Sequence, residues 1–250
     1  MPIRVAMVNY LNSKPFEFGL LQTKSLSNFD IITATPAECA DLFKSGRADI
    51  SLIPLGALTD IDDYRIISDY CIGCEGAVRT VSVFSNHDIR QCRKIYLDNH
   101  SRTSFLLTKI LMSQYMHLDM TYQPANVADV LPQEDEAVLM IGDKVFEYEK
   151  KFTYQYDLGV MWKEWTGLPF VFAIWIAKKD TPESAESLLN TALKYGIDHL
   201  DDIIKQQSSD NLDLYYYFKH NIQYDMDDSK KKGLQLFLDK VRHYNLISSQ

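Results

Sequence analysis

The sequence is poor in the residues that mark fibrous or linker-rich proteins. It holds ten glycines and eight prolines among 250 residues, which excludes a collagen-like or low-complexity chain. Its longest apolar run, Leu168–Ala177, is about half the ~20 residues that a transmembrane helix needs. Positive charge is also scarce, because 26 Lys and Arg against 34 Asp and Glu give a net charge of −8. That balance disfavours nucleic acid and anionic membranes as partners, although it allows a local basic pocket for a small anion.

What is present is an ordinary globular composition. Hydrophobic residues make up 46% of the chain and charged residues 24%. At about 100–200 residues per domain, the length predicts two domains or one large one. The chain enters an apolar run at residues 3–9 without the features of a secretory signal, which predicts a cytoplasmic location.

Apolar runs alternate with helix-start signals, which predicts an α/β architecture with mostly buried strands. Thr35-Pro36-Ala37-Glu38 combines a capping box with proline at the first helical position, so a helix is expected from there to about Ser45. The expected strands are 3–9, 48–54, 77–85, 94–98, 136–142 and 168–177. The other expected helices are 101–115, 181–206, 211–219 and 228–243. We expect a first domain of residues 1–87 plus 176–250 and a second of residues 88–175.

Cys71-Ile-Gly-Cys74 is a C-x-x-C motif. A zinc site would need a second such pair or two suitably spaced histidines, and the sequence has neither. A redox site would need the pair to open a helix, whereas a glycine and a strand follow it here. Buried thiols beside a loop are therefore the favoured interpretation, and whether the two cysteines pair stays open.

Polar side chains follow the expected N-terminal strand in Val8–Phe16, which reads V-N-Y-L-N-S-K-P-F. Asparagine both donates and accepts hydrogen bonds, so Asn12 suits a bound hydroxyl or carboxylate. Ligands gather where strands of an open α/β sheet end. A plain loop with asparagine caps is equally consistent with the sequence.

A second polar cluster joins the strand at 94–98 to the following helix. Ser101, Arg102, Thr103 and Ser104 lie at the helix start, with His100 beside them. Backbone amides, hydroxyls and a guanidinium there can converge on one anion, which favours anion binding over an elaborate N-cap.

A third candidate is Gly142-Asp143, at the end of an apolar strand. Asp143 is interpreted either as the cap of the helix that follows or as an acid, base or hydrogen-bond acceptor toward a ligand.

Together these segments resemble the chorismate dehydratase family of the futalosine route to menaquinone. Val8–Phe16 is similar to the family's V-N-Y-L-N-x-x-P opening. The resemblance continues through Ala48–Pro54, Gly76–Val81, Leu97–Ser104, Ile141–Asp143, Asp157–Gly159 and Thr166–Ala173, in the family's order. One position departs from the family pattern, because Thr80 stands where a serine is expected.

The resemblance implies an α/β, two-lobed type II periplasmic-binding-protein-like fold with a ligand cleft between the lobes. It implies a carbon–oxygen lyase that removes water from chorismate to give 3-[(1-carboxyvinyl)oxy]benzoate in menaquinone biosynthesis. It implies no cofactor and no metal, and the small molecule chorismate as the partner. The oligomeric state is left open.

The resemblance also implies roles for individual residues. The catalytic residues are Asn12, Thr80 and Asp143, and the substrate-binding residues are Tyr10, Ser101, Arg102, Thr103, Ser104 and Gly142. Chorismate is a dianion, so the helix-start cluster would hold one carboxylate. Asn12 and Thr80 would bind the departing hydroxyl or the second carboxylate. The base is either Asp143 or the substrate's own enolpyruvyl carboxylate, and Arg102 is alternatively a structural ion pair.

Three other functions share this fold. A solute-binding protein for a small carboxylate anion would carry a secretion signal. The sister naphthoate synthase of the same pathway is expected to open differently from V-N-Y-L-N. A ligand-sensing regulatory domain would usually carry a DNA-binding helix-turn-helix, for which 250 residues leave no room.

Overall fold

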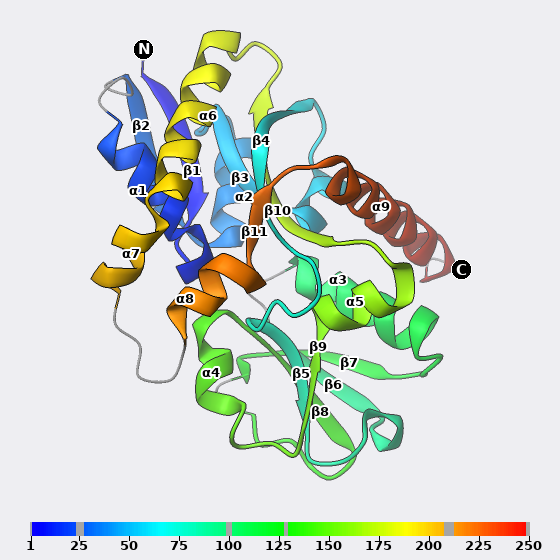
Figure 1. The fold of residues 1–250 in the computed structure, drawn as a ribbon. Coiled ribbons are helices and arrows are strands. Elements are labelled where there is room, and N and C mark those ends of the chain that lie inside the picture. The colour runs from blue at the N-terminus through cyan, green and yellow to red at the C-terminus, as the bar shows by residue number, and fades with distance from the viewer. Residues whose placement is uncertain (1, 24–27, 99–101, 128–129, 208–212, 249–250) are drawn as a thin grey trace. The chain divides into compact units, whose positions relative to one another are not determined.

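The computed structural model describes residues 2–23, 28–98, 102–127, 130–207 and 213–248, with side chains as far as Tyr244. The chain divides into two compact units (Figure 1). Unit 1 consists of Met1–Gly73 and Val171–Asp227, and unit 2 consists of Cys74–Phe170 and Asp228–Gln250. Each unit contains one mixed sheet with helices, as the α/β prediction requires.

The sheet of unit 1 has the strand order β11-β4-β10-β3-β1-β2. β1 pairs in parallel with β2 and β3, whereas β10 runs antiparallel to β3. The strands are β1 (Ile3–Val8), β2 (Phe29–Ala34), β3 (Ile50–Pro54), β4 (Tyr64–Cys74), β10 (Phe170–Lys178) and β11 (Gln223–Asp225). The helices are α1 (Lys14–Gln22), α2 (Pro36–Lys44), α6 (Glu183–Asp198), α7 (Leu200–Gln206) and α8 (Leu214–Tyr216), with a π-helical turn at Tyr217–Asn221 and 3₁₀ turns at Leu11–Ser13 and Leu55–Asp60.

The sheet of unit 2 has the strand order β7-β6-β8-β5-β9. β6 is parallel to β7 and β8, and β5 is antiparallel to β8 and β9. The strands are β5 (Val81–Ser85), β6 (Lys94–Asp98), β7 (Thr121–Ala125), β8 (Glu136–Ile141) and β9 (Tyr154–Asp157). The helices are α3 (Arg102–Ile110), α4 (Val145–Tyr148), α5 (Leu158–Thr166) and α9 (Asp228–Ser248), with 3₁₀ turns at Ile89–Gln91 and Gly142–Lys144 and a π-helical turn at Leu111–Tyr115.

The central strands are buried on both faces, which explains why they read as apolar runs. All residues of β3, β5 and β8 are buried. In unit 2, the buried ring of Trp162 lies 5.1 Å from Phe170 and 6.2 Å from Phe237 of α9, centroid to centroid. These aromatic contacts hold α9 in the core of unit 2.

Helices α1 and α6 of unit 1 approach each other closely through two glycines (Figure 1). A Cβ on Gly19 would lie 1.9 Å from the carbonyl oxygen of Ala192, and a Cβ on Gly196 would lie 1.8 Å from that of Pro15. Only glycine permits such backbone contact. Because Pro15 follows the polar loop after β1, this contact fixes the end of that loop.

The predicted capping box is confirmed. Thr35 is the N-cap of α2, its amide donates to Glu38 Oε2 at 2.8 Å, and its hydroxyl accepts from the Glu38 amide at 3.4 Å. The helix ends before Gly46, whose φ of +74° suits glycine.

Two predicted elements need correction. The strand expected at 77–85 begins only at Val81, because a turn with Gly76 at φ +99° and Arg79 at φ +67° precedes it. The helix expected at 181–206 is interrupted at His199 to give α6 and α7.

The structure also places the C-x-x-C cysteines and the two units. Cys71 lies within β4 and Cys74 is its last residue, directly before the bend at Glu75 and Gly76. Both thiols are buried, as predicted, and neither forms a disulfide. Residues three apart in a strand point to opposite faces, so the two side chains do not face each other. The predicted bounds, 1–87 plus 176–250 and 88–175, differ from the two units. β5 pairs with β8 and β9, and α9 packs on α3, so both belong to unit 2.

None of the helices that the structure describes is both long enough and apolar enough to cross a membrane.

Candidate functional site

The polar loop of unit 1 begins where β1 ends, at Val8. The buried Ser13 organises it, since its hydroxyl lies 2.6 Å from the carbonyl oxygen of Val8 and 2.8 Å from that of Tyr10. The Tyr10 amide donates to the same hydroxyl at 3.1 Å. The predicted residues Tyr10 and Asn12 are therefore on a locally fixed turn, and both are half-buried.

Asn12 carries an unusual combination of contacts. Its backbone carbonyl accepts a 2.9 Å hydrogen bond from the Tyr224 hydroxyl of β11. Its side-chain Oδ1 is buried, yet no donor for it exists among the described residues. A buried acceptor without a donor costs about 1–3 kcal/mol, so such groups in native proteins call for an explanation. A ligand hydroxyl is a donor of the required kind.

Sequence reasoning missed Tyr224. It lies 212 positions from Asn12 in a segment without a recognisable motif, and only sheet pairing of β11 with β4 places it. Its ring is buried and packs edge-on against Phe16 at 5.3 Å. The only local signal was an aromatic residue in a short strand-like segment.

The predicted residues of unit 2 gather at one edge of its sheet. β6 and β8 run in parallel, so Asp98 and Ile141 end at the same edge. β5 starts there as well, because Val81 pairs with Ile141. The Gly142 amide donates to the Thr80 carbonyl at 2.8 Å, which joins two of the predicted residues directly.

The helix-start cluster has two buried hydroxyl residues. Thr103 and Ser104 are 1% and 2% exposed in the first turn of α3, whereas Arg102 is exposed. The first turn of a helix presents free amides and a partial positive charge, which suits a carboxylate. The predicted residues Ser101 and His100 lie outside the described residues.

Thr80, Gly142 and Asp143 differ in exposure. Thr80 is buried, and its hydroxyl donates to the Val78 carbonyl at a long 3.4 Å. Gly142 has a φ of +70°, which turns the chain out of β8, and Asp143 is exposed in the 3₁₀ turn that follows. The N-cap positions of this turn and of α4 are Ile141 and Lys144, so the interpretation of Asp143 as a helix cap is wrong.

Asp157 supports this edge of the unit 2 sheet. Its carboxylate is the N-cap of α5 and also accepts the amides of Val78 and Arg79 in the turn before Thr80. Burial raises the pKa of the Asp157 carboxyl, although these backbone N–H groups oppose the shift.

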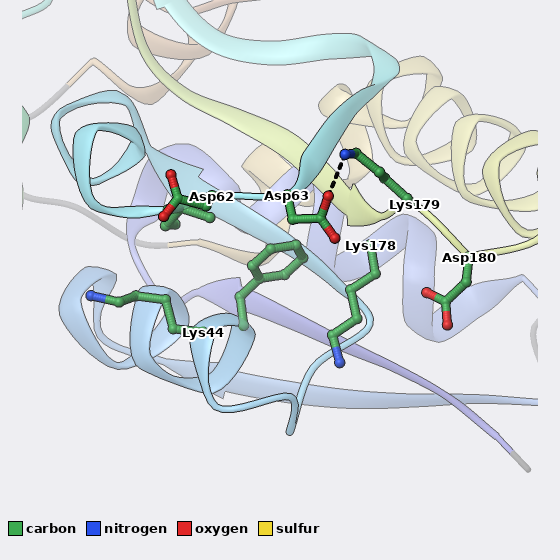
Figure 2. Close-up of a pocket in the computed structure, with 8 residues that line it drawn as sticks. Lys44, Asp62, Asp63, Lys178, Lys179 and Asp180 are labelled. Atoms are coloured by element: carbon green, nitrogen blue, oxygen red, sulfur yellow. Dashed lines mark ion pairs between the residues drawn. The ribbon is translucent and has the colours of Figure 1, made fainter.

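Two cavities of unit 1 lie away from its polar loop. One, of about 530 Å³, is lined by the end of α2, the segment before β4 and the end of β10 with the two residues after it. The other, of about 670 Å³, lies by Arg4 and Asp49 at the start of β1 and β3. The polar loop follows the opposite end of β1. Figure 2 shows that the cations of the first cavity do not converge: Lys179 pairs with Asp63, while Lys44 and Lys178 point in other directions. Neither cavity gathers groups suited to bind one anion.

No group of three or more His, Cys, Asp or Glu in the part of the chain that the structure describes is arranged to hold a metal ion.

The fold places the chain in a class. An Archaeoglobus fulgidus protein of known structure matches with a TM-score of 0.75 at 17% identity, covering 98% of both chains. A Candida albicans protein described as having the generic periplasmic binding protein fold matches with a TM-score of 0.68 at 14% identity, covering 98% of this chain and 90% of that one. The periplasmic aliphatic sulphonate binding protein of Escherichia coli gives 0.65 at 11% identity, covering 99% and 92%. The chain thus has the periplasmic-binding-protein-like fold, as predicted.

Sequence comparison narrows the class to a family. The family model described as menaquinone biosynthesis matches residues 3–243, and the chain belongs to that family. A chorismate dehydratase of Thermus thermophilus is 23% identical over 263 residues, which cover 96% of this chain and 95% of that protein. A chorismate dehydratase of Campylobacter jejuni is 31% identical over 124 residues, 48% of this chain and 55% of that protein.

Proposed function

We propose that this protein is a chorismate dehydratase, which eliminates water from chorismate to give 3-[(1-carboxyvinyl)oxy]benzoate for menaquinone synthesis. Family membership and the near full-length match to the Thermus thermophilus enzyme support this activity. The structural observation that carries the proposal is Asn12 Oδ1, a buried hydrogen-bond acceptor with no donor among the described residues. A cytoplasmic location, as expected of a menaquinone biosynthetic enzyme, is part of the proposal.

The reaction follows from the chemistry of the substrate. The ring carboxylate of chorismate acidifies the C3 proton through the conjugated double bond. When a base takes that proton, the C3–H electron pair forms the new ring double bond, and the C4–O bond breaks. Hydroxide and the proton leave together as water, and the aromatic product makes the step strongly downhill. The protein's task is to hold the substrate and to manage the proton.

Each cluster suits a different part of the substrate. Asn12 Oδ1 accepts a hydrogen bond from the C4 hydroxyl and so orients the leaving group. The first turn of α3, with Thr103 and Ser104, holds one carboxylate through backbone amides and hydroxyls. Thr80 and the exposed Asp143 stand at the same sheet edge of unit 2, where Asp143 acts as acid or base. The enolpyruvyl carboxylate of the substrate is the alternative base.

The test is incubation of the purified protein with chorismate, followed by ultraviolet absorbance and mass spectrometry. We expect a product that is one water lighter and has a benzoate spectrum. Lys44→Ala alters the cavity at the other end of the unit 1 sheet and serves as the matched variant, with wild-type turnover expected.

Two outcomes would contradict the proposal. Chorismate that raises the melting temperature but is recovered unchanged indicates a solute-binding protein. Chorismate that neither binds nor reacts with the folded protein indicates another substrate.

A further inference from the structure

The Asp157 carboxylate joins two segments of unit 2 that are distant in sequence. Its Oδ1 accepts hydrogen bonds from the amides of Gly159 at 2.9 Å and of Val160 and Val78 at 3.2 Å each. Its Oδ2 accepts from the Arg79 amide at 2.8 Å. One side chain therefore caps α5 and holds the turn that leads into β5.

This turn needs external support. Arg79 has a φ of +67°, in the left-handed region that costs a non-glycine residue about 1–2 kcal/mol. Such conformations persist where the surroundings hold them in place. The Arg79 guanidinium is held by Glu149, with Nη2 2.9 Å from Oε2, and the Arg79 amide is held by Asp157.

The turn before β5 also packs directly against the start of α5. A Cβ on Gly159 would lie 2.3 Å from the Gly76 carbonyl oxygen and 2.7 Å from Cys74 Sγ. The absence of a side chain at Gly159 thus lets the turn reach the helix-capping carboxylate.

The turn positions the candidate site of unit 2. Thr80 follows Arg79 directly, and its carbonyl accepts the Gly142 amide at 2.8 Å. A shift of Arg79 would therefore move Thr80 and, through this hydrogen bond, the Gly142-Asp143 turn. Misplacement of site groups by about 1 Å can lower a rate by about a hundredfold.

We propose that Asp157 is a positioning residue, whose carboxylate fixes Thr80 and Gly142-Asp143 for the reaction. The inference rests on the proposed dehydratase function. Asp157 does not touch the reacting atoms, and acts through the strained turn at Arg79.

Asp157→Asn tests the inference with little change of shape. The amide oxygen can occupy the Oδ1 position and keep the α5 cap, because asparagine caps helices as well as aspartate does. The NH₂ group then faces the Arg79 N–H, so that hydrogen bond is lost. Asp88→Asn is the matched control, since Asp88 caps the 3₁₀ turn Ile89–Gln91 in the same unit by accepting the Arg90 amide at 2.9 Å.

We expect D157N to lower kcat about 10- to 100-fold and to speed hydrogen exchange of the Arg79 amide, while D88N keeps wild-type turnover. The melting temperature of D157N should fall modestly, because the Arg79 amide loses its acceptor while the Gly159 and Val160 amides keep theirs. If D157N does not fold, Asp157→Ser replaces it, because serine can cap α5 but is too short to reach Arg79.

The double variant T80V/D157N separates positioning from general support. If Asp157 acts partly through the Thr80 hydroxyl, D157N lowers kcat by a smaller factor in the T80V background than in wild type. Two results would overturn the inference while the dehydratase function stands. One is a loss of kcat in the double variant equal to the product of the two single losses, and the other is equal turnover in D157N, D88N and wild type. A wild-type protein that leaves chorismate unchanged overturns the proposed function, and the role of Asp157 in it.

Discussion

The Tyr224 hydroxyl donates a 2.9 Å hydrogen bond to the Asn12 carbonyl, joining β11 to the loop after β1. Burial raises the pKa of Tyr224 well above its usual value, so the phenol stays a donor across the physiological range. The bond anchors the backbone of Asn12 while the side-chain oxygen keeps no donor among the described residues. Asn12 is thereby arranged as a fixed acceptor.

Removing this anchor is expected to slow turnover. Tyr224→Phe keeps the ring packed on Phe16 but deletes the donor, and a neutral hydrogen bond is worth about 1 kcal/mol, or roughly fivefold in rate. Tyr156→Phe is the control in unit 2, since the Tyr156 hydroxyl accepts the Ile89 amide at 2.9 Å. Equal kcat values for the two variants would show that the Tyr224 anchor has no part in catalysis.

Asn12→Ala is expected to separate activity from stability. Alanine removes a buried acceptor that has no donor, so the melting temperature should stay unchanged or rise. Turnover of chorismate should fall about a hundredfold or more, as for other lost oriented polar groups in active sites.

Asn190→Ala is the matched control for Asn12. Asn190 Oδ1 accepts from Ser68 Oγ at 2.8 Å and from the Asp69 amide at 3.3 Å. Its loss should lower the melting temperature and leave kcat unchanged. A strongly destabilised N12A with normal kcat per folded molecule would assign Asn12 a purely structural role.

Gly196→Ala is expected to destabilise unit 1. The new methyl group would lie 1.8 Å from the Pro15 carbonyl, so α1 and α6 must separate. Overpacking of this kind costs about 1–3 kcal/mol or more in the free energy of unfolding, measurable by urea titration. Ser187→Ala, at an exposed position of the same helix, should change stability little. An unfolding midpoint of G196A equal to that of S187A would disprove the close contact.

Asp157 is expected to give stability a distinctive pH dependence. Because burial raises its folded-state pKa above the unfolded value of about 3.9, the folded chain binds this proton more tightly. The resulting stabilisation is complete below the unfolded pKa and is lost as the pH rises through the folded pKa. D157N does not titrate at this position. The melting temperature of wild type minus that of D157N should therefore decrease as the pH rises above the unfolded pKa; an increase would indicate a lowered pKa.

Much of the local structure was predictable because its causes are local. The capping box at Thr35 and Glu38 lies within four consecutive residues, and the glycine that ends α2 needs only its own backbone freedom. The strand at 77–85 was predicted too long because alternation continued through residues whose conformation is set elsewhere. Arg79 is left-handed as a result of contacts with Asp157 and Glu149.

The residue types of the candidate site were predictable, but the residues that hold them in place through hydrogen bonds were not. Polar residues after strands mark Asn12 and Gly142-Asp143 in the sequence, since strand ends are where open α/β sheets place ligands. Tyr224 and Asp157 gave no such signal. Their roles depend on hydrogen bonds to partners far away in the chain.

The sequence by itself determined the α/β class, the buried central strands, the caps and the family, because these depend on residue type and short spacing. The tertiary structure alone decided that β5 and α9 belong to unit 2, that β4 extends through Cys71 to Cys74, and that Asp143 is exposed and not a cap. It also decided which buried polar atoms have partners. Pairing between strands, helix packing and burial bring together residues that no local pattern connects, and so only the folded chain specifies them.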